Sequence, residues 1–423
     1  MEAQQRTALQ EWKAHWPKVV AGTAGMSFYA MLTYHFGLFI QPLQAEFGWD
    51  RAQISLGLSI YTAGAMLLGP LVGWQIDRFG SRIIGIIGLI GTSLSLAALS
   101  FADGSLSQWY LLWFAIAVTA LGVKSTIWGA AISSLFVTSR SLALSLVLSG
   151  SAIAQLLAPI GANWVIAHEG WRSAYRWLGL GWGGFALILV LLMFFDAHDQ
   201  RKKAGPVTVP VASLGGLTVK EALRNPPILR MALGNVLMST LGAGILVHMV
   251  PILTGTGIDR TSAAAMTGSA GVAGIVGKLL TGYLLDRHRG DFIPFTSFAL
   301  GAIGYALLLN WFHSPIALTI GIMILGYTSG AGLQVTTYLC SRYGGMRNFG
   351  KIYATIGSMM MLGTTIGPWL AGAVYDHFHS YQIMLMVASP TVLICGFLFV
   401  GLGPYPHFPS QGPEGEAEAA LAG

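Results

Sequence analysis

Charged residues are scarce in this sequence. Asp, Glu, Lys and Arg make up 9% of its 423 residues, whereas a soluble globular domain carries about 25%. So little charge cannot cover the surface of a water-soluble particle. The shortage therefore excludes an ordinary soluble enzyme or binding domain and indicates a protein that lies in a membrane.

Cysteine and the motifs of nucleotide or metal chemistry are also nearly absent. The two cysteines, Cys340 and Cys395, lie in apolar stretches, which excludes a disulfide scaffold or a cysteine-rich metal site. The chain contains no G-x-x-x-x-G-K-[ST] phosphate loop, and His377 and His379 have no third metal ligand nearby. We therefore expect no metal, no cofactor and no enzymatic activity.

Hydrophobic residues, by contrast, make up 54% of the chain and form a long series of apolar runs. Each run has about 20 to 30 residues, and a helix needs about 20 to cross a bilayer. The polar stretch 1–17 lacks the apolar core of a signal peptide, so we expect the first run to remain. The runs predict an all-α polytopic membrane protein with twelve transmembrane helices, at residues 18–43, 53–76, 83–102, 108–137, 142–167, 174–195, 230–254, 262–285, 292–312, 315–339, 350–375 and 380–402.

One long polar segment divides these spans six and six. We expect a short helix within it, near Val219 to Arg224. The last residues are polar and rich in Gly, Glu and Ala, which is typical of a disordered tail. The predicted domains are an N-terminal six-helix bundle (1–195), a cytoplasmic central loop (196–229), a C-terminal six-helix bundle (230–403) and a disordered cytoplasmic tail (404–423).

The basic residues predict the orientation. If the N-terminus and the central loop share one side of the membrane, that side receives 17 of the 23 Lys and Arg residues. Only Arg51, Arg172, Arg176 and Arg260 fall on the opposite side. Because basic loops stay in the cytoplasm, both termini are expected there. The net charge of +6 then needs no nucleic-acid partner.

A short motif recurs in the two halves. The loop after the second span reads GWQIDRFGSR, and the loop after the eighth reads GYLLDRHRGD. Repeated six-span halves are one way to build an alternating-access transporter, and the shared G-x-x-x-D-R suits the contact between moving helices. A glycine permits close approach, and an Asp can accept hydrogen bonds from helix N-termini. The predicted gating residues are Gly73, Asp77, Arg78, Gly80, Arg82, Gly282, Asp286 and Arg287.

With this motif, four longer stretches resemble a known family. They are YHFGLFIQPLQAEFGWDRAQIS (34–55), FVTSRSLALSLVLSGSAIAQ (136–155), EGWRSAYRW (169–177) and RNFGKIYATIGSMMMLGTTIGPWLAGAVYD (347–376). The chain is similar to the bacterial oxalate/formate antiporter and monocarboxylate transporter group of the major facilitator superfamily. The resemblance covers nearly the whole chain. It implies two six-helix bundles and transport of small carboxylates bound between them.

Two lysines lie inside the spans. Lys124 is about 15 residues from either end of the fourth span, roughly 22 Å, and Lys278 lies eight residues before Asp286. A lysine at mid-helix costs about 2.5 to 3.5 kcal/mol to insert, and none of the 17 carboxylates lies in the middle of a span. An unpaired buried ammonium loses its proton unless an anion pairs with it. We therefore expect the substrate to be an anion held by Lys124 and Lys278.

The eighth span departs from the resembling group. Members usually have an Arg there, often with an Asp nearby for proton coupling, whereas this chain has Lys278 and no acidic residue within the span. Histidine can take over proton handling because its pKa lies nearest physiological pH. His35 and His248, which precedes the helix-breaking Pro251, are the candidates, although a structural role is also open for each.

Further polar and aromatic residues could line the substrate route. The amides of Gln155 and Gln334 lie near mid-membrane and contact either substrate or a neighbouring helix. Trp128, one turn beyond Lys124, forms either a cation–π contact or an apolar wall. Tyr34 and Tyr381 are weaker candidates, because Tyr also anchors helices at the membrane interface.

These observations predict a secondary transporter of mono- or dicarboxylates in the bacterial inner membrane, working as a monomer. Its partners are the substrate, the lipid bilayer, and either protons or a counter-substrate anion. The alternative is a major facilitator exporter of amphipathic or drug-like compounds, which mid-membrane carboxylates would favour. A channel is a further alternative, but repeated halves fit a rocking mechanism better.

Overall fold

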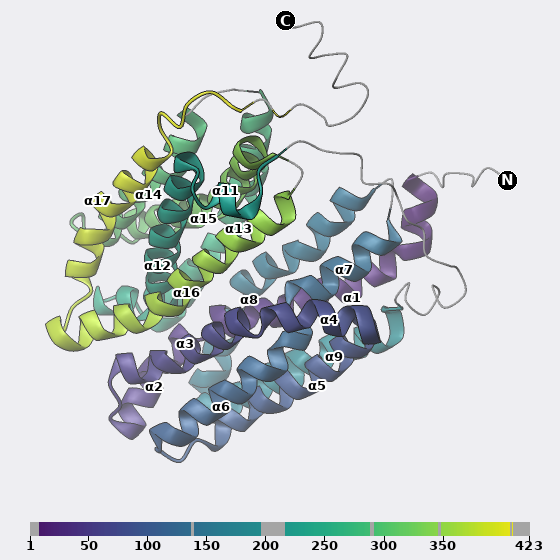
Figure 1. Ribbon diagram of the computed structural model, residues 1–423. Coiled ribbons are helices and arrows are strands. Elements are labelled where there is room, and N and C mark those ends of the chain that lie inside the picture. Colours follow the sequence, from purple (N-terminus) through teal and green to yellow (C-terminus); the bar gives the residue numbers. More distant parts are fainter. Residues whose placement is uncertain are drawn as a thin grey trace, which may run out of the picture. The chain divides into compact units, whose positions relative to one another are not determined.

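The computed structural model describes residues 8–136, 139–195, 216–287, 292–345, 348–406 and 408 (Figure 1). Helices make up nearly all of these residues, with one isolated β-bridge between Gly216 and Gly345. In chain order the helices are α1 (Ala8–Tyr34), α2 (Gly37–Phe47), α3 (Arg51–Leu67), α4 (Gly69–Phe79), α5 (Ser81–Ala98), η1 (Leu99–Phe101), α6 (Leu106–Thr119), η2 (Ala120–Val123), α7 (Ser125–Leu135), α8 (Arg140–Arg176), η3 (Trp177–Trp182), α9 (Gly183–Met193), α11 (Val219–Ala222), α12 (Pro226–Gly255), α13 (Arg260–Arg287), α14 (Phe292–Leu308), α15 (Pro315–Gly344), α16 (Phe349–Phe378) and α17 (Gln382–Leu398).

Within the described part of the chain, six helical segments are long and apolar enough to cross a membrane. One of them, Leu142–Met193, has 52 residues, which is the length of two crossings, and Gly170 interrupts it with non-helical backbone. Helices α14 and α17 are apolar but shorter. The six segments are Ser81–Phe101, Leu106–Ile132, Leu142–Met193, Pro226–Gly255, Arg260–Leu285 and Pro315–Gly344.

Three of the predicted spans are broken helices. The first breaks at His35 and Phe36, between α1 and α2, and the second at Leu68, between α3 and α4. Gly69 and Pro70 begin α4, and a proline at the start of a helix favours such a restart. The fourth span changes to a 3₁₀ segment, η2, and restarts after Lys124.

The described chain forms two compact units. Unit 1 comprises residues 1–205, 245–271 and 368–379, and unit 2 comprises 206–244, 272–367 and 380–423. Helices α12, α13 and α16 therefore contribute residues to both, and each division directly follows a glycine. The predicted linear division into two six-helix bundles stays a prediction.

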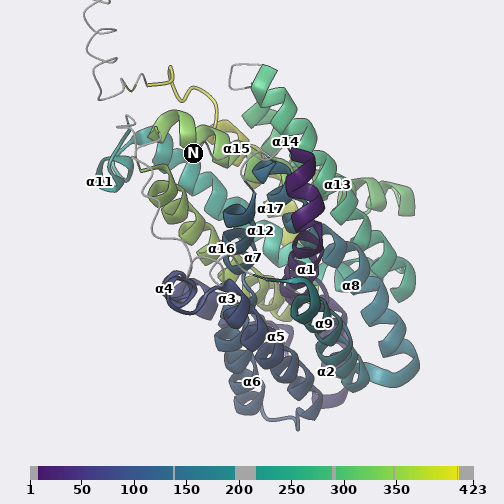
Figure 2. The same cartoon turned by 90° about the vertical axis from the view of Figure 1, so that its right-hand side faces the viewer.

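Large aromatic side chains fill the core of unit 1. Helix α6 lies alongside α3 and α5 (Figures 1 and 2), and its Trp109 and Trp113 are fully buried. Gly57 of α3 allows this packing, because a Cβ there would lie 2.4 Å from the Trp113 ring. On the other side of Trp109, Tyr175 stacks on Phe39 with 3.9 Å between ring centroids. These contacts fix α2, α3, α6 and α8 against one another.

Unit 2 is held together by glycines at its helix crossings. Helix α14 packs against α15 and α17, and Phe298 stacks on Phe399 with ring centroids 4.4 Å apart. Helices α13 and α15 approach so closely that a Cβ on Gly330 would lie 2.1 Å from the Gly274 carbonyl oxygen. Small residues allow such backbone contact between membrane helices.

Candidate functional site

Lys124 lies at the break between η2 and α7 rather than in the middle of a continuous helix. Its backbone is extended, with φ −59° and ψ 152°, and Ser125 begins α7. The tight approach of Gly122 to Gly88 shapes the break, because a Cβ on Gly88 would lie 2.4 Å from the Gly122 carbonyl carbon. Broken helices inside membrane proteins commonly mark substrate sites, because they free backbone groups for a ligand.

The Lys124 ammonium donates to the Ala65 carbonyl oxygen at 3.0 Å. Ala65 is in the last turn of α3, where helix carbonyls lack partners along the helix and carry partial negative charge. Gly69 stands beside the ammonium, since a Cβ there would lie 2.9 Å from Lys124 Nζ. An ammonium has three donors, so this hydrogen bond leaves two donors for an anion.

Helices α1 and α3 add a pair of hydroxyl groups near this junction. The Tyr61 and Tyr29 hydroxyls share a hydrogen bond, and Tyr61 lies one turn before Ala65 on α3. Tyr29 lies one turn after Gly25 on α1, where a Cβ would collide with the Trp128 ring. Sequence reasoning did not single out Tyr29 or Tyr61, because nothing in either span shows that they meet.

Trp128 is a fully buried packing residue of unit 1. Its indole nitrogen donates to the Val123 carbonyl at 2.8 Å, and its ring meets Phe194 edge-on at 5.3 Å between centroids. The ring also fills the space that Gly25 and Gly85 leave open. Of the two predicted roles, these contacts favour the apolar wall.

Lys278 lies on α13 in unit 2, with its side chain half-buried. The α13–α15 seam fixes its backbone, because a Cβ on Gly330 would lie 3.1 Å from the Lys278 amide nitrogen. Three residues further along α13, Thr281 shares a hydrogen bond of 3.2 Å with the Tyr327 hydroxyl of α15. Tyr327 is therefore a polar neighbour of the Lys278 region that sequence reasoning also missed.

Among the residues that the structure describes, neither Lys124 nor Lys278 forms a salt bridge. The described ion pair joins Arg172 to Glu46 at 2.5 Å, outside the predicted spans, where Trp171 also donates to Glu46 at 2.6 Å. Partial burial raises the pKa of Glu46, but the hydrogen bonds from Trp171 and Arg172 and the Arg172 charge outweigh it, so that this pKa lies below its ordinary value. The Glu46 carboxylate therefore serves the contact with Trp171 and Arg172 outside the predicted spans.

The two predicted histidines lie in different surroundings. His35 is fully buried at the α1–α2 break, where Nδ1 bonds the Met31 carbonyl at 2.6 Å and the ring packs edge-on against Phe39 and Tyr175. His248 of α12 is also fully buried, and its Nε2 lies 3.1 Å from Ser55 Oγ and 3.0 Å from the Pro368 carbonyl oxygen. A role of either residue in substrate or proton binding stays a prediction.

The remaining predicted binding residues are spread over both units. Tyr34 ends α1 and is half-buried, and Tyr381 is buried just before α17. Gln155 of α8 lies against α13, because a Cβ on Gly271 would lie 3.2 Å from Gln155 Cβ. Gln334 is half-buried on α15, seven residues after Tyr327 and thus on the same helix face.

The repeated motif occupies corresponding helix ends. Gly80 links α4 to α5 with φ +81°, a conformation that favours glycine. Arg82 donates to the Leu191 carbonyl at 3.2 Å and lies over the Phe195 ring, which joins α5 to the end of α9. Arg78 and Arg287 are exposed. Gly73 and Asp77 lie in α4, and Gly282 and Asp286 in α13, so the gating role of the motif stays a prediction.

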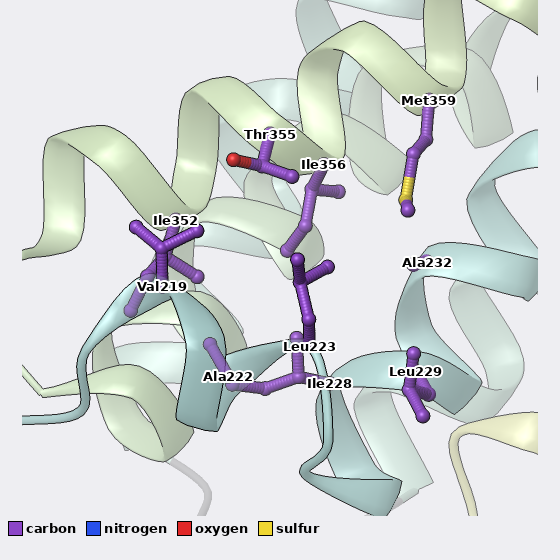
Figure 3. Close-up of a pocket in the computed structure, with 10 residues that line it drawn as sticks. All are labelled: Val219, Ala222, Leu223, Ile228, Leu229, Ala232, Ile352, Thr355, Ile356 and Met359. Carbon is purple, nitrogen blue, oxygen red and sulfur yellow. The ribbon is translucent and has the colours of Figure 1, made fainter.

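A small apolar groove in unit 2 offers an anion nothing to bind (Figure 3). Helix α11 covers α12 and α16 there, and the Thr355 hydroxyl is its one polar side-chain group. The end of the central loop is fixed beside it, because Leu217 donates to the Gly344 carbonyl at 2.9 Å and accepts from Asn348 at 3.0 Å. The predicted short helix near Val219 is observed as α11.

Comparison with known proteins identifies the class. The family model described as Major Facilitator Superfamily matches residues 22–296 and 232–422. A solved structure, the D-xylose-proton symporter, superposes with a TM-score of 0.72 at 14% identity, over 92% of this chain and 98% of that chain. The chain therefore belongs to the major facilitator superfamily and has its fold, as predicted.

The named relatives that this chain resembles include transporters of carboxylates. Monocarboxylate transporter 13 from Bos taurus is 27% identical over 381 residues, covering 88% of this chain and 85% of its own length. The cis,cis-muconate transport protein of Acinetobacter baylyi is 24% identical over 389 residues, covering 85% and 87%. The predicted similarity to the monocarboxylate transporter group is thus confirmed. The protein is a multi-pass membrane transporter and not an enzyme.

Proposed function

We propose that this transporter moves small mono- or dicarboxylates by alternating access, with Lys124 and Lys278 as contacts for the substrate's negative charge. The observation that carries the proposal is the Lys124 ammonium, half-buried at a helix break and bonded to the Ala65 carbonyl oxygen at 3.0 Å. A carbonyl dipole offsets only part of the cost of burying a charge. A bound carboxylate would offset the remaining cost of burying the charge and would accept hydrogen bonds from the two remaining N–H groups of the ammonium.

Residues around each lysine supply neutral contacts in this proposal. In unit 1, the Tyr29 and Tyr61 hydroxyls share one hydrogen bond, which uses the proton of one of them and leaves the other proton to donate to a carboxylate oxygen. In unit 2, Tyr327 and Gln334 share the face of α15 that runs past the α13 seam. Relatives named for monocarboxylate and muconate transport support this substrate class.

The chain lies in the bacterial inner membrane as a monomer, with both termini in the cytoplasm. Coupling follows one of two routes, proton symport or anion exchange. An inward pH gradient accelerates uptake in the first route and has no effect in the second, where substrate on the opposite side accelerates uptake instead. His248→Gln is expected to weaken a proton-driven response, because glutamine cannot take up a proton at neutral pH.

Uptake of radiolabelled mono- and dicarboxylates into proteoliposomes tests the proposal. Lys124→Ala and Lys278→Ala are each expected to lower uptake about 10- to 100-fold, the value of one charge-assisted hydrogen bond. Lys220→Ala is the matched control, because Lys220 lies on α11 and is exposed. If both buried-lysine variants transport like the control, the site assignment is wrong. Competition by organic cations but not by carboxylates would instead support the drug-exporter alternative.

A further inference from the structure

Within unit 1, the first turn of α3 meets the last turn of α16. In the predicted topology these turns lie on the outer side, opposite the central loop, and we call them the outer ends. The Asp376 carboxylate accepts from the backbone N–H of Arg51 at 3.0 Å and of Ala52 at 2.8 Å. These are the first two residues of α3, whose N–H groups have no partner along the helix.

This carboxylate completes the cap of α3 from a distant part of the chain. Asp50 and Gln53 form a local capping box at the same helix end, but the box does not use the N–H groups of Arg51 and Ala52. Asp376 serves both of them with its two oxygens, and the positive end of the helix dipole strengthens the interaction. Without Asp376, only water could replace these hydrogen bonds.

The helices touch closely around this carboxylate. A Cβ on Gly372 would lie 2.6 Å from the Ala52 amide nitrogen, so α16 approaches the α3 backbone directly. The Arg51 guanidinium lies 3.4 Å from the centroid of the Tyr375 ring and donates through Nε to Gln44 at 2.9 Å. Arg51 is 7% exposed, so water has little access to this contact.

A second layer lies one turn deeper along α3. His248 Nε2 lies between Ser55 Oγ of α3 and the Pro368 carbonyl of α16, and both His248 and Ser55 have no exposed surface. The carbonyl can only accept, so Nε2 carries the proton. Three helices are thus joined by one imidazole beneath the Asp376 contact.

Further hydrogen bonds extend this closure around the outer ends. Gln41 of α2 donates to Thr254 of α12 at 2.9 Å, and Asn163 of α8 donates to Thr261 of α13 at 3.1 Å. Arg260, at the start of α13, donates to the Leu38 carbonyl of α2. The outer ends of α12, α13 and α16 are therefore tied to α2, α3 and α8 by polar contacts that water can replace.

Alternating access, on which this inference rests, requires an outer gate, and we propose that Asp376 is the positioning residue that holds it shut by capping α3. A substrate reaches the membrane interior from the outer side only when α16 leaves the α3 N-terminus. Opening exposes the N–H groups of Arg51 and Ala52 to water, which replaces the carboxylate. The gate therefore opens more readily when the Asp376 charge is removed.

Labelling of a cysteine behind the gate measures its opening without any substrate. Ser55→Cys is introduced with Cys340→Ala and Cys395→Ala, and right-side-out vesicles are treated with a membrane-impermeant maleimide. Asp376→Asn is expected to raise the labelling rate about tenfold, because it loses one charge-assisted hydrogen bond. An unchanged or lower rate would overturn the proposal. Because no substrate is present, this outcome is independent of the carboxylate proposal.

Asp259→Asn is the matched control on the same side of the membrane. Asp259 also caps a helix N-terminus, that of α13, but it accepts from the backbone N–H of Ser262, three residues further along the same segment, at 2.9 Å. We expect its labelling rate to match the parent protein. An equal rise in both variants would show general loosening and would overturn the assignment to Asp376.

A cross-link tests the same gate without touching Asp376, in case its variants fold poorly. Gln41→Cys and Thr254→Cys are bridged with a short bifunctional methanethiosulfonate. Transport in proteoliposomes should fall to the background and return on reduction. Full transport by the bridged protein would mean that these ends do not separate, which would overturn the gate.

Discussion

The two membrane-embedded lysines are built into very different backbones. Lys124 lies in extended backbone between two helix segments, and its ammonium has a carbonyl partner, Ala65. Lys278 lies inside the continuous helix α13, where the Gly274–Gly330 seam fixes its backbone. Unit 1 therefore positions the ammonium itself, whereas unit 2 positions only the point from which the side chain extends.

This difference predicts different tolerance to change. A charge held by a defined hydrogen bond depends on the length and shape of its side chain, because the donor must still reach the acceptor. A charge on a free side chain depends mainly on being present, since it can adjust its rotamer to the ligand. The two lysines are chemically identical, so any contrast between them reports on the surrounding backbone.

Charge-conserving substitution should separate the two sites by the largest margin. Lys124→Arg is expected to lower carboxylate uptake at least about tenfold, because the planar guanidinium does not fit between Ala65 and Gly69 as an ammonium does. Lys278→Arg should stay within about threefold of the parent, since a charge on an adjustable side chain can still reach the ligand as a guanidinium. Proteoliposome kinetics with equal amounts of reconstituted protein measure both. Equal losses would mean that the contrast between the sites is unimportant for transport.

Replacing a glycine by alanine near each lysine should lower stability in unit 2 and transport in unit 1. Gly330→Ala places Cβ 2.1 Å from the Gly274 carbonyl oxygen, and backbone cannot move aside cheaply. We expect a loss of about 1 to 3 kcal/mol, visible as a lower thermal unfolding temperature in detergent.

Gly69→Ala meets only the end of the Lys124 side chain, at 2.9 Å. Its stability should change by less than about 0.5 kcal/mol, while uptake falls because the ammonium is displaced. A large stability loss in Gly69→Ala with normal transport would contradict the position given to Lys124.

The fold was largely predictable, because a membrane protein needs apolar runs of a set length and places its charged residues outside them. Breaks inside spans were harder to predict. Gly69 and Pro70 gave a usable signal for the α3–α4 break, since proline favours the first turn of a helix. The break at Lys124 had no comparable signal, because hydropathy measures burial in lipid and says nothing about helix continuity.

The candidate site was predictable only as far as charge allowed. Lys124 and Lys278 stood out because a lone charge in an apolar run is costly. The partners Ala65, Tyr29 and Tyr327 could not be found, because they depend on the register between helices. Asp376 is the extreme case, since it caps a helix 325 residues earlier in the chain.

Removing single hydroxyl groups should give the smallest effects and tests the neutral partners of each lysine. Tyr61→Phe removes the hydrogen-bond partner of Tyr29, and Tyr327→Phe removes the partner of Thr281. A neutral hydrogen bond contributes about 0.5 to 1.5 kcal/mol, so each change should raise the substrate KM about two- to tenfold. Tyr61→Phe should have the larger effect, because Tyr61 lies on α3 one turn before Ala65, the carbonyl partner of the already fixed Lys124 ammonium. Tyr305→Phe, in a buried part of α14 away from both lysines along the chain, serves as the control. If Tyr327→Phe exceeds Tyr61→Phe, unit 2 orients the substrate as tightly as unit 1, and the contrast drawn between the two lysines fails.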